Sequence, residues 1–87
     1  MNQKKEKEKE KARELRKSRW WQNLINSSPL CYYCSVSMDK DEVTMDHIVP
    51  LSRGGKSTKG NIVPSCKLCN NKKKDKTASE FFLSMKS

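Results

Sequence analysis

The first part of the chain is dense in charge and has no apolar stripe. Residues 2–19 mix Lys, Arg and Glu around only two apolar side chains, Ala12 and Leu15. These residue types favour helix, and Glu14 and Lys17 lie one turn apart, where an opposite-charge pair adds a few tenths of a kcal/mol. We expect a charged helix that is frayed or solvated at its start and becomes firmer toward Trp20.

A packing face begins immediately after this segment. Trp21, Leu24 and Ile25 follow the i, i+3, i+4 spacing of an amphipathic helix. We expect the two tryptophans to anchor a small core, and base stacking by one of them is the alternative. Residues 26–29, Asn-Ser-Ser-Pro, end the helix.

Two short strands are predicted in the middle of the chain. Val43 and Met45 alternate with polar neighbours, a pattern typical of a half-buried strand, and residues 39–41 predict a hairpin turn before it. The strand ends before Pro50 because proline is poorly tolerated inside a sheet. A polar loop with glycines follows, and residues 61–65, Asn-Ile-Val-Pro-Ser, predict the second strand.

Two short helices are predicted near the C-terminus. Residues 70–76 are strongly basic and begin the first of them. Thr77 and Glu80 have the spacing of a capping box, which predicts the start of the second. The aromatic side chains of that last helix can cover a small core.

The size of the chain limits what holds it together. At 87 residues it is one domain at most, and hydrophobic residues make up only 33% of it. A core this thin usually needs a covalent or metal staple. The candidate staple is the set of cysteines, which form two C-x-x-C pairs: Cys31, Cys34, Cys66 and Cys69.

These cysteines could form disulfides or bind a metal ion. The chain opens without the apolar segment of a signal peptide, so we expect a cytoplasmic, reducing setting, which favours metal thiolates. Two C-x-x-C turns complete the tetrahedral shell of a structural Zn²⁺ and leave no position open. Because 31 residues separate Cys34 from Cys66, the zinc is expected to clamp the strand and loop between them.

The charge of the chain indicates a polyanionic partner. It carries 19 basic and 10 acidic residues, a net charge of +9, and nucleic acid is the first candidate. A lysine-rich surface that only aids solubility is the alternative, and a membrane surface is disfavoured because no segment is both basic and strongly amphipathic. Residues 1–19 hold nine basic and four acidic groups and are either a soluble tail or a DNA-contacting arm.

A second site is indicated between the cysteine pairs. His47, the only histidine, follows Asp46 directly. A lone histidine is often a surface or satisfied core residue, and the four thiolates do not need it. However, a glycine-containing loop comes next, Asn61 opens the second strand, and Asn70 follows the last cysteine. This set is not explained by zinc.

Residues 30–76 resemble the HNH endonuclease family. The matching segments are Met-Asp-His-Ile-Val-Pro-Leu-Ser-Arg-Gly-Gly at 45–55 and Asn-Ile-Val-Pro-Ser-Cys-Lys-Leu-Cys-Asn-Asn-Lys-Lys at 61–73. The last motif position is Asn rather than His, a variant that keeps a metal-binding oxygen. The resemblance implies a small α+β fold: a ββα-metal (HNH, or His-Me finger) core, stapled by the four-cysteine zinc, with flanking N- and C-terminal helices.

The resemblance also implies roles for these residues in the hydrolysis of DNA phosphodiester bonds to 5′-phosphate and 3′-hydroxyl ends. His47 would be the general base, and Asp46 and Asn70 would ligate one catalytic divalent ion, Mg²⁺ or another. Asn61 would fix the loop and the orientation of His47. Neighbours on a regular strand point to opposite faces, so Asp46 and His47 can serve one phosphate only if the strand ends or distorts there, with the ion and the base approaching from different sides.

Basic side chains around the loop and the last cysteines are expected to hold phosphates of double-stranded DNA, which positions a duplex without reading its sequence. They are Arg53, Lys56, Lys59, Lys67, Lys72, Lys73, Lys74 and Lys76. We divide the chain into a basic N-terminal helix or arm at residues 1–25 and a zinc-containing HNH nuclease domain at residues 26–87.

Two other functions remain open. A non-catalytic zinc module that binds nucleic acid leaves the His-Asn set without a role, and a protein-interaction zinc domain leaves the charge unexplained as well. A monomer and a homodimer both fit the sequence, as does a setting in a phage, a mobile element or a restriction system.

Overall fold

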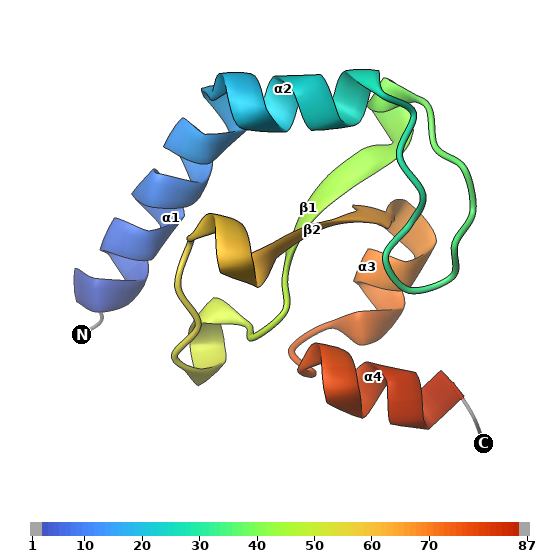
Figure 1. Ribbon diagram of the computed structural model, residues 1–87. Coiled ribbons are helices and arrows are strands. Elements are labelled where there is room, and N and C mark those ends of the chain that lie inside the picture. The colour runs from blue at the N-terminus through green and yellow to red at the C-terminus, as the bar shows by residue number, and fades with distance from the viewer. Residues whose placement is uncertain (1–2, 86–87) are drawn as a thin grey trace.

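A computed structural model describes residues 3–85, and Figure 1 shows its arrangement. The elements are α1 (Gln3–Lys17), α2 (Arg19–Asn26), β1 (Val43–His47), β2 (Ile62–Cys66), α3 (Lys67–Lys73) and α4 (Ala78–Met85), with short 3₁₀ turns at Lys40–Glu42, Leu51–Arg53 and Lys59–Asn61. Helices α1 and α2 lie along one side of the strands, and α3 and α4 along the other. The predicted small α+β fold is confirmed.

Strands β1 and β2 form a two-stranded antiparallel sheet, with Val43 opposite Cys66 and His47 opposite Ile62. The hairpin predicted at residues 39–41 is wrong. That segment leads into a 3₁₀ turn at Lys40–Glu42, and β1 pairs with β2 across the intervening loop. The ββα order of β1, β2 and α3 places the second cysteine pair where the sheet meets the helix.

The N-terminal region is two helices rather than one. Helix α1 ends at Lys17 and α2 begins at Arg19. Ser18 produces the break: its backbone is extended, and its side chain accepts a hydrogen bond from the backbone N–H of Trp21 at 3.2 Å, which is the N-cap arrangement. Helix α2 ends at Asn26, as the following Ser-Ser-Pro predicts.

The hydrophobic core lies between the sheet, the first cysteine turn and α4. Its buried members are Cys31, Tyr33, Met38, Val63, Cys69, Ala78 and Phe81. The ring of Tyr33 packs edge-on against Phe81, with centroids 5.1 Å apart, and lies tilted against the ring of Phe82, with centroids 5.3 Å apart. The C-terminal aromatics therefore cover the core as the sequence predicts.

Both C-terminal helices have side-chain caps. Helix α3 begins at Lys67, three residues before its predicted start, because Sγ of Cys66 accepts the backbone N–H of Cys69 at 3.4 Å and caps the helix. The capping box before α4 is present: Thr77 and Glu80 each accept the other's backbone N–H. These caps set where α3 and α4 begin beside the sheet.

The loop after β1 is held by close backbone contacts. Gly55 donates its N–H to the carbonyl of Pro50 at 2.9 Å, and a Cβ at Gly55 would lie 1.7 Å from the carbonyl oxygen of Val49. Only glycine fits there. In the part of the chain that the structure describes, no helix has the length and apolar character needed to cross a membrane.

Candidate functional site

The four cysteines converge on one point, as predicted. Their Sγ atoms all lie within 4.8 Å of one another, and those of Cys34 and Cys66 are 3.8 Å apart. A zinc tetrahedron with Zn–S bonds of about 2.3 Å has S···S edges of about 3.8 Å. Cys31 and Cys34 come from the turn after α2, whereas Cys66 and Cys69 come from the β2–α3 junction. The cluster is therefore placed to hold a metal ion and to tie these two parts of the chain together.

The backbone around Cys31 favours a thiolate. Burial acts to raise the pKa of Cys31, but hydrogen bonds from backbone N–H groups outweigh it and lower the pKa to about 6. Two of these bonds come from Tyr33 and Cys66, each 3.4 Å from Sγ. Because thiolate is the form that binds metal, this geometry suits a metal ligand.

His47 is the last residue of β1, and its side chain lies on the α1 side of the sheet. Its Nε2 is 3.0 Å from the hydroxyl of Ser57, and that hydroxyl donates to the backbone carbonyl of Glu8 at 2.5 Å. Since the single hydroxyl proton goes to Glu8, Ser57 accepts from Nε2–H of His47. Nδ1 of His47 is then the nitrogen that can accept a proton.

The surroundings of His47 also favour its neutral form. Burial lowers the pKa of His47 below its ordinary value of about 6.5. The charges of Arg16 and Lys73 act in the same direction, and the carboxylate of Asp46 opposes them. A neutral imidazole at cellular pH can act as a proton acceptor.

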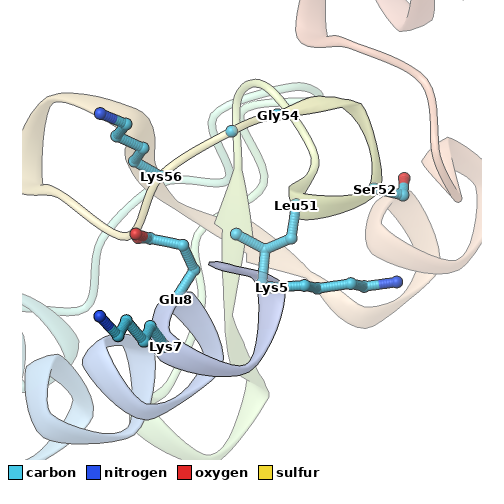
Figure 2. Close-up of a pocket in the computed structure, with 8 residues that line it drawn as sticks. Lys5, Lys7, Glu8, Leu51, Ser52, Gly54 and Lys56 are labelled. Carbon is cyan, nitrogen blue, oxygen red and sulfur yellow. The ribbon is translucent and has the colours of Figure 1, made fainter. Parts of the chain in front are cut away.

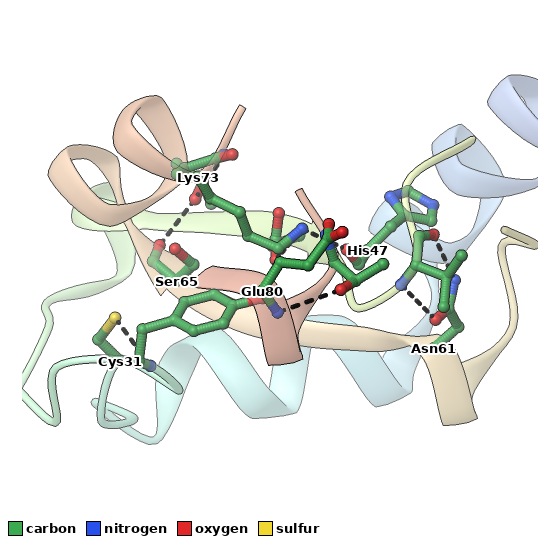
Figure 3. A network of polar contacts seen from close by, with 12 residues as sticks. Cys31, His47, Asn61, Ser65, Lys73 and Glu80 are labelled. Carbon is green, nitrogen blue, oxygen red and sulfur yellow. Dashed lines mark hydrogen bonds and ion pairs between the residues drawn. The ribbon is translucent and has the colours of Figure 1, made fainter. Parts of the chain in front are cut away.

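Asp46 precedes His47 on β1 and therefore points to the opposite face of the strand. There it belongs to a buried polar network that includes Lys73 (Figure 3). Its Oδ2 accepts a hydrogen bond from the hydroxyl of Tyr33 and lies 3.4 Å from Nζ of Lys73. Nζ of Lys73 also donates to the backbone carbonyl of His47 at 2.8 Å. Burial, and then the hydrogen bond to Asp46, raise the pKa of Tyr33. The Asp46 carboxylate is thus paired with a cation of the chain itself.

Asn70 reaches the same face of β1 as Asp46. From α3, its Nδ2 donates to Oγ1 of Thr44 at 3.0 Å, and Thr44 is two residues from Asp46 on the strand. The structure therefore brings Asp46 and Asn70 to the α3 side of the sheet, and places His47 on the α1 side.

Asn61 ties the loop that follows His47. Its Oδ1 accepts from the backbone N–H of Val49 at 2.9 Å, and its Nδ2 donates to the carbonyls of Val49 and Lys56 at 3.0 and 2.9 Å. The backbone carbonyl of Asn61 also accepts the N–H of Ile48 at 2.9 Å. Through these bonds Asn61 fixes the chain immediately after His47.

The predicted nucleic-acid contacts divide into exposed and engaged side chains. The structure corrects the prediction for Lys73. Its side chain is 1% exposed and paired with Asp46, so it belongs to the core and cannot contact DNA here.

The other predicted contacts lie nearer the surface. Arg53 is exposed but bonded to Glu80, and Nζ of Lys59 lies 5.7 Å from the ring centroid of Trp20. The side chains of Lys56, Lys67, Lys72 and Lys74 are exposed, and that of Lys76 is partly buried.

Several residues at the site were not identified from sequence. In the sequence, Tyr33 is simply one of the residues between two cysteines, and Ser57 is one of many polar loop residues. Neither position carries a pattern that predicts a role at the site. Helix α1 carries no motif, yet Glu8 accepts the backbone N–H of Ser57 at 2.6 Å and α1 packs beside His47. The one sequence feature that indicates a role for α1 is the excess of basic over acidic groups in residues 1–19.

A family model described as HNH endonuclease matches residues 31–85. The chain therefore belongs to the HNH endonuclease family, and the resemblance drawn from its motifs is confirmed. No curated protein matches the chain. The family, together with the cysteine cluster, indicates a nuclease-type function with a metal site.

Proposed function

We propose that this protein is a metal-dependent endonuclease that hydrolyses DNA phosphodiester bonds with His47 as the general base. The observation that carries the proposal is the environment of His47 in an HNH chain. Its ring is oriented by Ser57, its pKa is lowered by burial, and it borders an open cleft lined by Lys9, Arg13 and Arg16.

The proposed reaction uses His47 at one defined atom. With Nε2–H held by Ser57, Nδ1 takes the proton from the attacking water, a step worth roughly 10²–10⁴-fold in rate. Asn61 holds the backbone of Val49 and so supports the position of His47. The exposed basic side chains of the loop and of α3 hold phosphates and position the duplex.

The catalytic ion is assigned to the α3 side of the sheet, where Asp46 and Asn70 both lie. Asn70 keeps Oδ1 as a ligand atom because its Nδ2 is used by Thr44, and Asp46 supplies a carboxylate. Such oxygens suit a hard ion of the Mg²⁺ type, which supplies charge neutralisation at the phosphate and the leaving oxygen. Lys73 already balances the charge of Asp46, so a divalent ion has to compete with this ammonium.

Zinc is proposed for the cysteine cluster, with a structural role only. Four thiolates, whose Sγ atoms all lie within 4.8 Å of one another, would fill the coordination shell and leave no site for water. The two metals then have separate tasks: one holds the β2–α3 junction against the first cysteine turn, and the other serves the phosphate.

A supercoiled-plasmid assay tests the proposed function. The purified protein is incubated with plasmid in the presence of Mg²⁺, Mn²⁺ or Ni²⁺, and without a divalent ion. We expect conversion to nicked circles only with an ion, and loss of this activity in Asn70→Ala but not in Asn71→Ala, its exposed neighbour on α3. A wild-type protein that holds zinc and binds DNA but nicks with none of these ions would instead be a non-catalytic binding module.

A further inference from the structure

Helix α1 forms one wall of a cleft whose other side is the HNH core. The cleft has a volume of about 380 Å³ and is lined by Lys9, Ala12, Arg13, Arg16, His47 and Leu51. A neighbouring cavity of about 510 Å³ lies between the same helix and residues 51–56, and Lys5, Lys7 and Lys56 border it (Figure 2). Basic groups of α1 therefore border both cavities, and Leu51 lines both.

The position of α1 relative to His47 is fixed by polar bonds. Ser57 donates its backbone N–H to the carboxylate of Glu8 and its hydroxyl to the carbonyl of Glu8, and the same hydroxyl binds His47. Ala12, one turn further along α1, is only 3% exposed and lines the same cleft as His47. The helix is therefore seated beside His47 and does not behave as a detached tail in this structure.

The cations of the cleft lie on one face of α1. Lys9, Arg13 and Arg16 follow each other at four and three residues, which places them in a row on a helix. From Lys9 to Arg16 the row extends about 10 Å at 1.5 Å per residue. A DNA strand carries a phosphate about every 3.4 Å along its axis, so the row matches a run of about three phosphates.

These charges are available to a ligand. Within residues 3–85, the ion pairs are Lys11–Glu8, Arg53–Glu80 and Lys73–Asp46, so the row has no carboxylate partner in the described chain. No acidic residue lines the cleft. A row of unpaired cations in an open cleft is suited to the phosphates of a nucleic acid.

We propose that Lys9, Arg13 and Arg16 form a phosphate-binding wall that holds the backbone of the DNA strand whose scissile phosphate reaches His47. This inference rests on the proposed nuclease function and assigns a role to the N-terminal helix, outside the residues that the family model matches. In the alternative arrangement, α1 would shield His47 and oppose cleavage.

The test compares two triple variants with the same loss of charge. In the wall variant, Lys9, Arg13 and Arg16 are changed to Gln. In the control, Lys17, Arg19 and Lys40 are changed to Gln; these are exposed and border neither cavity. Zinc content and far-UV circular dichroism confirm that both variants are folded.

Binding is measured by anisotropy of a short fluorescein-labelled DNA duplex over a range of salt concentrations, with His47→Ala in every chain to prevent cleavage. We expect the wall variant to reduce the slope of log Kd against log salt by about 3, close to one for each phosphate that is no longer neutralised. We expect the control slope to change by less than about 1. Equal slopes in the two variants would overturn the proposal.

Plasmid nicking by the same variants with His47 intact separates the remaining outcomes. We expect the wall variant to nick more slowly than the control. Faster nicking by the wall variant would overturn the proposal in favour of a shielding helix. If the wild type does not nick at all, the proposed function fails, while the binding slopes still decide whether α1 contacts the phosphates.

Discussion

The hydroxyl of Ser57 lies 3.0 Å from Nε2 of His47 and leaves Nδ1 as the basic nitrogen of the ring. This bond joins β1 to the loop, and through Glu8 to α1. The orientation of the proposed base therefore depends on a residue ten positions away in sequence and on a helix outside the motif region.

The pH dependence of cleavage follows from the environment of His47. Burial lowers its pKa below about 6.5, so the neutral form, which the proposed general base requires, persists to a lower pH than in a free histidine. We expect kcat/KM to rise with pH and to reach its plateau with a midpoint below 6.5. The rate–pH profile of plasmid nicking, measured with Mg²⁺, checks this. A midpoint above 7 would contradict the assignment, because it would require a charged partner that stabilises imidazolium.

The lowered pKa of His47 also makes the free energy of unfolding depend on pH. The unfolded chain has the higher histidine pKa, so it binds more protons than the folded chain in the interval below about 6.5. The contribution of His47 to folding is therefore complete above that pH and is lost as the pH falls through the interval.

Removing one thiolate should remove the fold. In Cys66→Ser, the remaining cysteines leave the tetrahedron incomplete, and the same change removes the Sγ cap of α3. Structural zinc contributes about 10–16 kcal/mol of apparent binding energy in small zinc domains, so we expect loss of metal and of cooperative unfolding together. Metal analysis and circular dichroism measure both. Ser79→Ala, an exposed change on α4, should keep both, and a folded, metal-free Cys66→Ser protein would contradict a structural metal.

The buried pair of Lys73 and Asp46 gives a further test. Lys73→Met leaves the carboxylate without its cation, and breaking a buried pair in this way costs about 3–5 kcal/mol. Lys72→Met, an exposed neighbour, should change stability by less than about 0.5 kcal/mol. Urea unfolding measures the difference.

Magnesium should act differently on these two variants. If Asp46 can ligate a divalent ion, removal of the competing ammonium strengthens binding, and Mg²⁺ then stabilises Lys73→Met more than Lys72→Met. Thermal unfolding with and without Mg²⁺ measures this. An equal effect of Mg²⁺ on both variants would place the ion away from Asp46.

The loop after His47 depends on a glycine for steric reasons. In Gly55→Ala the new methyl would lie 1.7 Å from the carbonyl oxygen of Val49, so the loop has to move. We expect a loss of at least about 1–3 kcal/mol, the usual cost of overpacking, and slower DNA cleavage because His47 is displaced. Gly60→Ala is the matched control, since nothing lies within 4 Å of its added methyl. Equal unfolding midpoints for the two variants would contradict this role of the glycine in the loop.

The cysteine cluster, the strands and the capping box could be predicted because each depends on a recognisable spacing of residues in the sequence. Two C-x-x-C turns fix the ligand geometry, and the period-two pattern at Val43–His47 fixes a strand. The wrong hairpin at residues 39–41 shows the limit of this reasoning, because turn residues do not reveal which distant segment a strand pairs with. Here β2 supplies the partner, beginning at Ile62.

The polar network could not be predicted because burial is not visible in composition. Lys73 lies in a run of lysines, which predicts a DNA contact. In the structure, α3 directs its side chain into the core, where it pairs with Asp46. Similarly, α1 has no apolar stripe, and it is seated by hydrogen bonds between Glu8 and Ser57 that no sequence period encodes. Both features arise from tertiary contacts between segments far apart in the chain.

The most direct test of the central claim is a single-turnover cleavage measurement on end-labelled duplex DNA with Mg²⁺, comparing the wild type with His47→Ala. Both proteins are first shown to hold zinc and to bind the duplex with the same affinity. We predict that His47→Ala cleaves roughly 10²–10⁴ times more slowly, the usual contribution of a general base. Cleavage by His47→Ala at the wild-type rate would contradict the role of His47 as that base.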